Sequence, residues 1–289
     1  MADLSPDDAP LDVLRQPLER LLAQLRGEDL FLWSNPGNAG DALIRVAARQ
    51  AIERADLQVV EISPDGDVAG GTALVIGGGN LVPYYDEVDR AFVQLREGGA
   101  GRIIVLPHTI RGTPSTLTVA EPGDVIMCRD TVSVEVVRRS GCRAPTVLAH
   151  DVAFHLDAGD FLSDPELSRI AEPALAHSDA SRHLDQGIVL LTRTDCERGA
   201  ASPSSDVDIS SLFGFGGGRT ATSVSAWCFL TFISRCRSIV TDRLHVAIGS
   251  ALVGTECVLL PNSYDKNEAV YRHSLSRFAN VTFQGQWSQ

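Results

Sequence analysis

Short, uniformly apolar runs separated by helical stretches are the feature of this sequence that most limits its fold. Runs such as TALVIGGG (72–79), RIIVLP (102–107) and SIVTD (238–242) lack the alternation of a strand with one face in water. Segments with apolar residues at helical spacing lie between such runs or beside them, for example LDVLRQPLERLLAQL (11–25). Buried strands alternating with helices predict parallel sheets covered on both faces, which is an α/β fold.

The alternation is interrupted once, near the middle of the chain. Residues 157–186 are acidic and rich in alanine and serine, with weak periodicity, and we expect them to form an interdomain connection with some helix. The strand–helix pattern then restarts with GIVLLTR (187–193). Two consecutive α/β segments predict two Rossmann-like domains facing a cleft, residues 1–160 and residues 161–289.

Composition and charge exclude several classes of protein. The 289 residues are 44% hydrophobic and 21% charged, which is typical of a globular chain. The formal net charge of −12 disfavours nucleic acid as a partner and limits membrane contact to the periphery. The acidic start MADLSPDDAPLD has no apolar signal core, and no run reaches the ~18 apolar residues of a membrane span. We expect a cytoplasmic protein, either free or at the inner face of the membrane.

The six cysteines are scattered without a CxxC pair, which fits neither a zinc site nor a disulfide framework. Most lie in apolar segments, so we interpret them as reduced core cysteines in a reducing compartment. The chain has no HExxH metal motif and no nucleophile elbow. The sequence therefore predicts chemistry without a metal and without a covalent nucleophile.

The segment TDRLHVAIGSALVG (241–254) combines an apolar helical body with a polar first turn, and it follows the strand SIVTD. Either Thr241 or Asp242 is expected to cap the helix. Arg243 can offer a bidentate donor to phosphate or carboxylate, and His245 can exchange a proton near neutral pH. Because a strand end followed by a helix N-terminus favours an anion, we expect Arg243 and His245 to be functional.

A second polar strand end follows ECVLLP, where PNSYDKNEAVYRH carries Asn262, Tyr264 and Lys266. Lys266 by itself would more often be a solvated charge. Two adjacent strand ends that are both polar and basic instead predict one anion pocket shared with Arg243.

Two glycine-rich strand ends in the first half can approach a ligand closely. NPGNAGDALI places Asn38 and Asp41 at a strand-to-helix turn, and VIGGGN supplies Gly78, Gly79 and Asn80. Asp41 equally suits a helix cap, and the run of glycines equally suits a plain tight turn.

Further polar positions follow strands in the first half. LPHTIRG carries His108, for which an ordinary surface loop is an even competitor. MCRDTVS places Arg129 at a strand end, where it can meet an anion, and Asp130 where a helix cap belongs. Asp151 lies in PTVLAHDVAFHL, the segment that closes this half.

Taken in order, these segments resemble the polysaccharide pyruvyltransferase family over roughly residues 31–275. The strongest resemblance is in TDRLH and in the N-x-Y-x-K pattern of 262–266. The full ordered set is NPGNAGDALI, VIGGGNL, LPHTIRG, CRDTVSVEVV, HDVAFHL, TDRLHVAIGSALVG and LPNSYDKNEAVY.

The resemblance implies a GT-B-like pair of Rossmann-like domains, with the acceptor on the first domain and phosphoenolpyruvate on the second. It implies transfer of the enolpyruvyl carbons of phosphoenolpyruvate onto two hydroxyls of a sugar, with release of phosphate. The product is a pyruvate ketal in exopolysaccharide or cell-surface polysaccharide biosynthesis. The acceptor would be lipid-linked or nucleotide-linked, and no cofactor beyond the donor substrate is implied.

We derive roles for the donor side from this reaction. Arg243 and Lys266 would anchor the phosphate and carboxylate of phosphoenolpyruvate, with Arg129 reaching in from the first domain. His245 would act as general acid toward the methylene carbon.

The acceptor side would be formed by the first domain. Asn38, Asn80 and the glycines would hold the sugar, and Asp41 or Asp151 would act as base. His108 departs from the family, which more often has glutamine in this loop, and we expect it to tune the site.

Two other functions compete with this one. A GT-B-type nucleotide-sugar glycosyltransferase would share the two-domain architecture but ignore phosphoenolpyruvate. A non-catalytic relative would bind glycan alone, although the intact Arg243, His245 and Lys266 argue against a degenerate site. The sequence leaves open the acceptor sugar and whether the chain forms a homo-oligomer.

Overall fold

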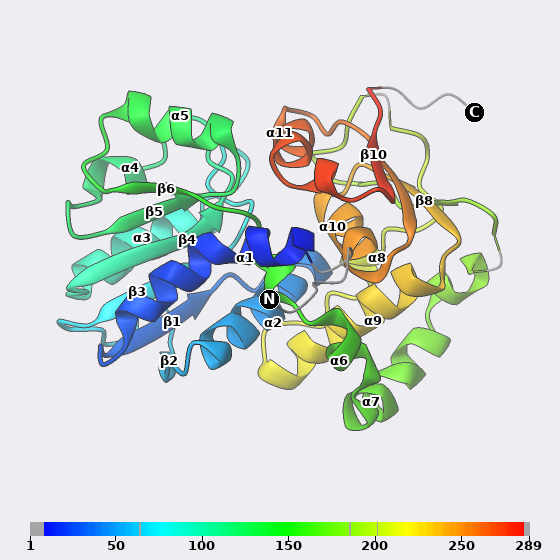
Figure 1. The fold of residues 1–289 in the computed structure, drawn as a ribbon, viewed down its shortest axis with the longest axis horizontal. Coiled ribbons are helices and arrows are strands. Elements are labelled where there is room, and N and C mark those ends of the chain that lie inside the picture. Colours follow the sequence, from blue (N-terminus) through cyan, green and yellow to red (C-terminus); the bar gives the residue numbers. More distant parts are fainter. Residues whose placement is uncertain (1–8, 64, 185, 201, 286–289) are drawn as a thin grey trace. The chain divides into compact units, whose positions relative to one another are not determined.

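The structure is a computed structural model that describes residues 9–63, 65–184, 186–200 and 202–285. The acidic start of the chain, interpreted above as lacking a signal core, falls mostly outside these residues. The described chain contains a six-stranded and a four-stranded parallel sheet with helices between the strands (Figure 1). The predicted α/β class is therefore confirmed, whereas the pairing of two Rossmann-like domains across a cleft stays a prediction.

The chain divides into two compact units. Unit 1 holds the chain up to Asn35 together with Ala48–His155, and unit 2 holds Pro36–Ala47 together with the chain from Leu156 onward. Helix α2 (Ala39–Arg54) therefore begins in unit 2 and ends in unit 1. The proposed boundary after residue 160 did not foresee that the NPGNAGD turn belongs with the second half of the chain.

Unit 1 contains the six-stranded sheet in the order β2-β1-β3-β4-β5-β6, with every pair parallel. Besides the end of α2, its elements are α1 (Ala9–Leu22), η1 (Ala23–Leu25), β1 (Leu30–Ser34), β2 (Val59–Glu61), β3 (Thr72–Ile76), α3 (Glu87–Glu97), β4 (Arg102–His108), α4 (Thr116–Val119), β5 (Val125–Cys128), α5 (Thr131–Ser140), β6 (Thr146–Leu148) and η2 (Val152–His155).

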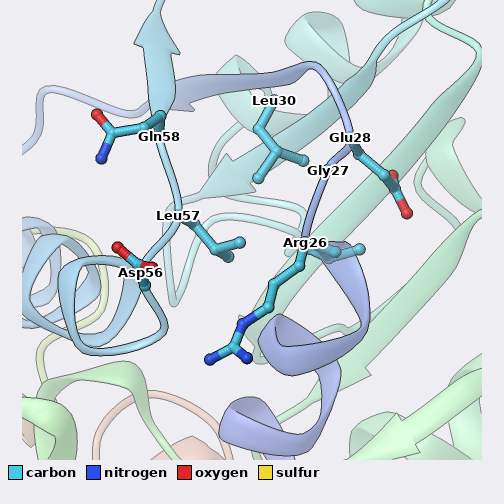
Figure 2. A pocket seen from close by; sticks show the side chains of 8 residues that line it. Arg26, Gly27, Glu28, Leu30, Asp56, Leu57 and Gln58 are labelled. Carbon is cyan, nitrogen blue, oxygen red and sulfur yellow. The ribbon is translucent and has the colours of Figure 1, made fainter.

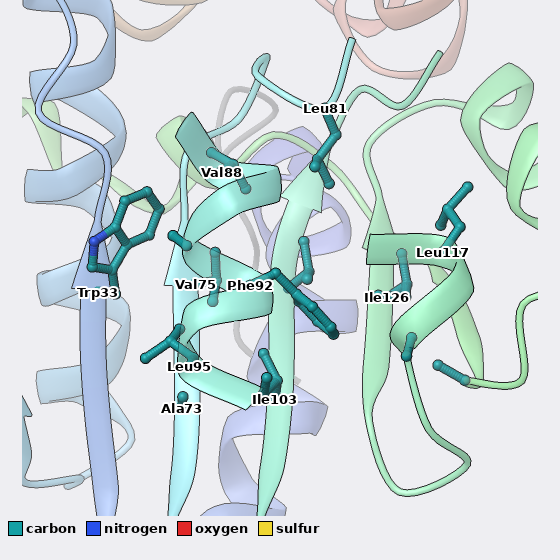
Figure 3. Close-up of a cluster of buried hydrophobic side chains, with 14 of the residues drawn as sticks. Trp33, Ala73, Val75, Leu81, Val88, Phe92, Leu95, Ile103, Leu117 and Ile126 are labelled. Carbon is teal, nitrogen blue, oxygen red and sulfur yellow. The ribbon is translucent and has the colours of Figure 1, made fainter. Parts of the chain in front are cut away.

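The core of unit 1 forms where the central strands meet α3. All five residues of β3 are buried, and the apolar face of α3, including Phe92 and Leu95, packs against Val75 and Ile103 (Figure 3). Strands buried on both faces need apolar residues at every position, which is why TALVI and RIIVL show no alternation. Their uniform composition is thus explained by their central place in the sheet.

Unit 2 contains the four-stranded sheet in the order β10-β9-β8-β7, again with every pair parallel. Besides the start of α2, its elements are α6 (Ala158–Ser163), α7 (Pro165–Ala176), η3 (Asp179–His183), β7 (Val189–Leu190), α8 (Ile209–Leu212), α9 (Arg219–Arg235), β8 (Ser238–Thr241), α10 (Leu244–Val253), β9 (Glu256–Leu259), α11 (Lys266–His273), η4 (Leu275–Arg277) and β10 (Val281–Phe283).

The stretch predicted to be an interdomain connection with some helix does contain helix, in α6, α7 and η3, and it belongs to unit 2. Helix α7 packs against α9, with Ala171 and Leu175 fully buried. The thiol of Cys228 in α9 contacts the Ala171 carbonyl oxygen at 3.5 Å. Helix α7 buries only Ala171 and Leu175 and carries Pro173 in its interior, a residue that normally argues against a helix, so the sequence does not mark it clearly as a core helix.

The structure also bears on the membrane and cysteine predictions. None of the helices in the described ranges is long and apolar enough to cross a bilayer. All six cysteines are free thiols, and four of them are buried. Burial raises the pKa of the Cys236 and Cys257 thiols to about 12, so these side chains behave as small apolar core residues.

Candidate functional site

Three basic side chains of unit 2 follow adjacent strands. Arg193 comes after β7, Arg243 after β8, and Lys266 opens the helix that follows β9. These strands are neighbours in one parallel sheet, so their carboxyl ends lie along the same edge. Open parallel sheets place ligands at this edge, which makes it the candidate site of unit 2.

The cap predicted for α10 is not formed by Thr241 or Asp242. Arg243 occupies the N-cap position, and its side chain makes no capping hydrogen bond. Thr241 donates its hydroxyl to the Leu191 carbonyl (2.5 Å), and the Asp242 carboxylate accepts the Arg193 backbone N–H (2.7 Å). Both side chains are used to hold the neighbouring strand end, so the prediction was wrong because it considered only contacts along the chain.

The Arg243 side chain is buried between two carboxylates. Its Nη2 donates to Asp195 at 3.2 Å and, in a very short contact, to Asp208. The Arg243 side chain is only 5% exposed. Its Nε is also buried and has no hydrogen-bond partner among the described residues. One donor edge of this arginine is therefore only half used.

Lys266 is held by a second buried carboxylate. Its ammonium donates to both oxygens of Glu197 (2.9 and 2.7 Å), which also accept the Tyr264 hydroxyl (2.7 Å) and pair with Arg193. The ammonium lies 5.2 Å from the centre of the Tyr264 ring. Asn262 supports this turn, because its Oδ1 accepts the N–H of the second residue of α11 (3.2 Å).

Burial and the neighbouring cations oppose each other at two carboxylates of the site, the buried Glu197 and the partly exposed Asp195. Burial alone would raise the pKa of Glu197, but the charges of Lys266 and Arg193 and the hydrogen bonds to it lower the pKa overall. The same balance lowers the pKa of Asp195 through Arg193 and Arg243. Both carboxylates are therefore ionised at neutral pH.

We call these six side chains the cation–carboxylate cluster: Arg193, Asp195, Glu197, Asp208, Arg243 and Lys266. Its three cations and three carboxylates balance in formal charge. Sequence reasoning missed four of the six, since residues 194–210 look like an ordinary polar stretch. The contacts to Arg243 and Lys266 join positions 35 to 69 residues apart, and the local signal in the sequence is the charge alternation in TRTDCERG.

His245 lies against the start of α2. A Cβ added to Gly40 would sit 2.6 Å from the Nδ1 of His245 and 2.9 Å from its Cβ. The approach is so close that only glycine fits at residue 40 without displacing the imidazole. The NPGNAGD turn therefore fixes the place of His245, a contact within unit 2 that joins two segments about 200 residues apart.

Asn38 and Asp41 cap the helix that this turn begins. The Asn38 side chain accepts the Gly40 N–H (2.8 Å), and the Asp41 carboxylate reaches back to the Asn38 N–H (2.8 Å). This reciprocal arrangement is a capping box in which Asn38 is the N-cap and Asp41 the third helical residue, so Asp41 takes part in capping without being the cap itself. The roles of Asn38 in sugar binding and of Asp41 as base stay predictions.

A separate buried network lies at the carboxyl edge of the sheet in unit 1. Arg129 pairs with Asp151 in a very short contact and donates from Nε to Thr109 (2.9 Å). Asp130 is the N-cap of α5 and accepts the Ser133 N–H (2.8 Å), as its capping role predicted. The Arg129 and Asp151 side chains are each no more than 1% exposed, and their roles toward a substrate stay predictions.

His108 is fully buried beside the glycine run rather than in a surface loop. Its Nδ1 contacts the carbonyl oxygen two residues earlier (2.5 Å), and its Nε2 lies 2.7 Å from where a Cβ of Gly77 would be. Burial lowers the pKa of His108 to about 4, so the ring is neutral at pH 7. Gly78 has φ +79°, and a Cβ at Gly79 would approach Arg129 at 3.1 Å. The positive φ of Gly78 and the close approach of Arg129 to Gly79 account for glycine at these two positions without a bound ligand.

A pocket of about 360 Å³ lies elsewhere in unit 1, at the amino-terminal ends of β1 and β2 (Figure 2). This is the opposite edge from the one where parallel sheets bind ligands, and its charged side chains lie at the surface. We therefore locate the candidate site by its chemistry rather than by this pocket. The pocket is lined by Leu25, Arg26, Gly27, Glu28, Leu30, Asp56, Leu57 and Gln58.

Comparison with known proteins identifies the family. The family model for polysaccharide pyruvyl transferase matches residues 38–264, which include both the α2 turn and the α10 turn of the site. The chain belongs to the polysaccharide pyruvyl transferase family. It is also similar to the crystal structure of a functionally uncharacterized protein, KP1_0663, from Klebsiella pneumoniae subsp. pneumoniae NTUH-K2044. That likeness has 28% identity and a TM-score of 0.74, and it covers 94% of this chain and 98% of the other. No curated protein matches the sequence.

Family membership makes the chain a transferase and makes a polysaccharide its acceptor. Within the described ranges, no group of three or more His, Cys, Asp or Glu side chains is placed to hold a metal ion. The expectation of metal-free chemistry stays a prediction.

Proposed function

We propose that this polysaccharide pyruvyl transferase moves the enolpyruvyl group of phosphoenolpyruvate onto two hydroxyls of a glycan sugar, forming a pyruvate ketal and releasing phosphate. The observation that carries the proposal is the placement of Arg243 and His245 in one turn, at a sheet edge that also gathers Arg193 and Lys266. An anionic donor and a proton transfer need those side chains together.

The reaction begins with protonation of the methylene carbon of phosphoenolpyruvate, which leaves an oxocarbenium-like centre at C2. One sugar hydroxyl adds to C2 and loses its proton. The second hydroxyl then replaces the phosphate at C2 and loses its proton in turn, so the products are the ketal and inorganic phosphate. We assign the first proton transfer to His245 and the anchoring of the donor anion to Arg243 and Lys266, with Arg129 as a further anchor.

The proton acceptor for the sugar hydroxyls is Asp41 or Asp151 in this proposal. Each is already engaged, Asp41 by the Asn38 N–H and Asp151 by Arg129 and the Ala153 N–H. The sugar hydroxyl would add to these contacts. The other predicted substrate-binding residues, among them Asn80 and Asn262, would contact the sugar or the donor.

The rest of the proposal concerns the setting of the reaction. We propose that the two units divide the work as the domains of a GT-B-like transferase do, the first binding the acceptor and the second binding phosphoenolpyruvate. The product would be an exopolysaccharide or a cell-surface polysaccharide, and the acceptor a lipid-linked or nucleotide-linked sugar. A cytoplasmic location and a homo-oligomeric state stay predictions from the sequence.

A thermal-shift panel tests the donor first. Phosphoenolpyruvate should raise the melting temperature of the purified chain, whereas UDP-, GDP- and TDP-sugars without it should not. With an accepted sugar, His245→Ala and Arg243→Ala should lose phosphate release while keeping their circular dichroism spectra. A shift with nucleotide sugars alone would favour a glycosyltransferase, and near-wild-type turnover in both variants would refute the assignment of these residues.

A further inference from the structure

Arg243 is a donor anchor with a buried side-chain N–H that makes no hydrogen bond to the described residues. Arginine normally pairs with a planar anion through Nε and Nη2 together, which gives two parallel hydrogen bonds. Here Nη2 contacts two carboxylates at once, while the adjacent Nε, although buried, donates to none of the described residues. An incoming phosphate or carboxylate would complete that edge, but Asp208 occupies the Nη2 half of it.

Asp208 is the carboxylate of the cluster that can leave most easily. Its other contacts are with neutral groups: the Thr194 hydroxyl (3.2 Å), the Ser211 N–H (3.4 Å) and the Ser211 hydroxyl (3.1 Å). As the N-cap of α8, it would keep the two Ser211 contacts after it released Arg243. The Asp208 carboxylate would therefore keep hydrogen bonds after it left Arg243. A buried ion that loses all its partners is strongly destabilising, and these contacts avoid that cost.

The other two carboxylates are held more firmly. Asp195 accepts two hydrogen bonds from Arg193 (2.7 and 2.9 Å), and Glu197 accepts two from Lys266. Each would remain paired with its own cation if Arg243 turned toward a ligand. Asp208 has no second cation among the described residues, so its pairing with Arg243 is the weak point of the cluster.

We propose that Asp208 is a displaceable counter-ion that occupies the donor site and sets the affinity for the donor. This inference rests on the proposed function, because it takes Arg243 as the anchor of an anionic donor. In the structure the three cations of the cluster are balanced by three carboxylates. The donor anion binds by replacing Asp208 on Arg243, so each binding event includes breaking that ion pair.

Removing the Asp208 charge should therefore strengthen donor binding. Asp208→Asn keeps an oxygen at the N-cap, where asparagine is as favourable as aspartate, and Asp208→Ser offers a second capping residue. Each variant should bind phosphoenolpyruvate about tenfold more tightly than the wild type, since a hydrogen bond to a charged group contributes about that factor. Calorimetric titration of the full chain measures the change.

Asp206→Asn is the matched control. It removes the same charge two residues away, but the Asp206 carboxylate accepts the Leu190 backbone N–H (2.8 Å), a bond that asparagine can keep. Its dissociation constant for phosphoenolpyruvate should stay within about twofold of the wild type. An equal gain in both variants would mean a general charge effect and would overturn the role of Asp208.

The outcomes also separate this inference from the proposed function. Unchanged or weaker phosphoenolpyruvate binding in Asp208→Asn and Asp208→Ser would show that Asp208 positions Arg243 rather than competing for it. Inorganic phosphate and pyruvate supply the two anionic groups of the donor separately. If either bound more tightly to the variants while phosphoenolpyruvate bound to no form, the counter-ion role would stand and the proposed donor would fall. If no form bound any of the three anions, both would fall.

Discussion

The Glu197 carboxylate joins two cations of the cluster, and replacing it tests whether the cluster is desolvated as the structure shows. Its side chain is 2% exposed and contacts Lys266, Arg193 and Tyr264. Glu197→Gln keeps the shape of the side chain but removes the negative charge that Lys266 and Arg193 share. Removing one partner of a buried ion pair lowers the free energy of unfolding by about 3 to 5 kcal/mol. Because the amide oxygen of glutamine still accepts a hydrogen bond, we expect the lower value, about 3 kcal/mol.

Urea unfolding followed by Trp227 fluorescence measures this cost in unit 2. Trp227 is buried in α9, and replacing the other two tryptophans, at positions 33 and 287, with phenylalanine makes it the sole fluorophore. The control is Glu172→Gln, which breaks a bidentate pair with Arg235 in the same unit where both side chains are more than 40% exposed. Exposed pairs contribute less than about 1 kcal/mol, so this variant should remain close to the wild type.

Two further readouts sharpen the test. Adding Lys266→Met to Glu197→Gln removes the stranded ammonium, so the double variant should lose clearly less than the sum of the single losses. The folded-state pKa of Glu197 lies below its ordinary value of 4.5. Its contribution is therefore complete above pH 4.5 and is lost as the pH falls through the folded pKa, where the wild type approaches the variant. A cost of Glu197→Gln no larger than that of Glu172→Gln would refute the desolvated cluster.

Three more predictions follow from single contacts. Gly40→Ala should displace the His245 imidazole, because the added Cβ would clash with it. A misplacement of about 1 Å can lower a reaction rate ~100-fold, so we expect the rate of phosphate release to fall at least tenfold. Gly159→Ala, whose Cβ meets no close neighbour, should leave that rate unchanged. Asp56 lies just beyond the end of α2 and has φ +57°, so Asp56→Gly should be more stable than Asp56→Ala by about 1 kcal/mol in thermal melts. The pKa of His108 is lowered from 6.5 to about 4, so the contribution of the neutral ring to stability is complete above pH 6.5 and is lost as the pH falls toward 4. Between pH 7 and pH 5, the free energy of unfolding measured by urea titration should therefore fall by about 2 kcal/mol less in His108→Gln than in the wild type.

The sequence predicts best those elements whose burial is visible in their own residues. Strands β3 and β4 are central in the sheet of unit 1, so burial on both faces makes every residue apolar and the assignment clear. Helix α7 buries only Ala171 and Leu175 and carries Pro173 in its interior, so a residue that usually breaks helices stands inside a helix that packs on α9. Packing against a neighbouring helix stabilises this segment, and the local sequence does not report that contact.

The residues of the candidate site likewise fall into those that the sequence predicts and those that it does not. Arg243, His245 and Lys266 could be predicted because each follows a buried strand in the sequence, and strand order then places two of these ends side by side. Asp208 and Glu197 could not, since neither a motif nor a strand end marks them and their partners lie 35 and 69 residues away. Counter-ions of buried cations are fixed by three-dimensional contacts that no local pattern reports.

The counter-ion role of Asp208 leads to a last prediction, which concerns the product. Phosphate leaves the site at the end of the reaction, and if phosphate is the group that Arg243 holds, the return of Asp208 to Arg243 assists its release. Inhibition by inorganic phosphate should then become about tenfold stronger in Asp208→Asn, by the same factor as donor binding, because both anions displace the same carboxylate. Initial rates at several phosphate concentrations measure this inhibition, with Asp206→Asn as the control. Tighter donor binding with unchanged phosphate inhibition would contradict the prediction and would show instead that Arg243 holds the donor's carboxylate, leaving its phosphate to Lys266 or Arg193.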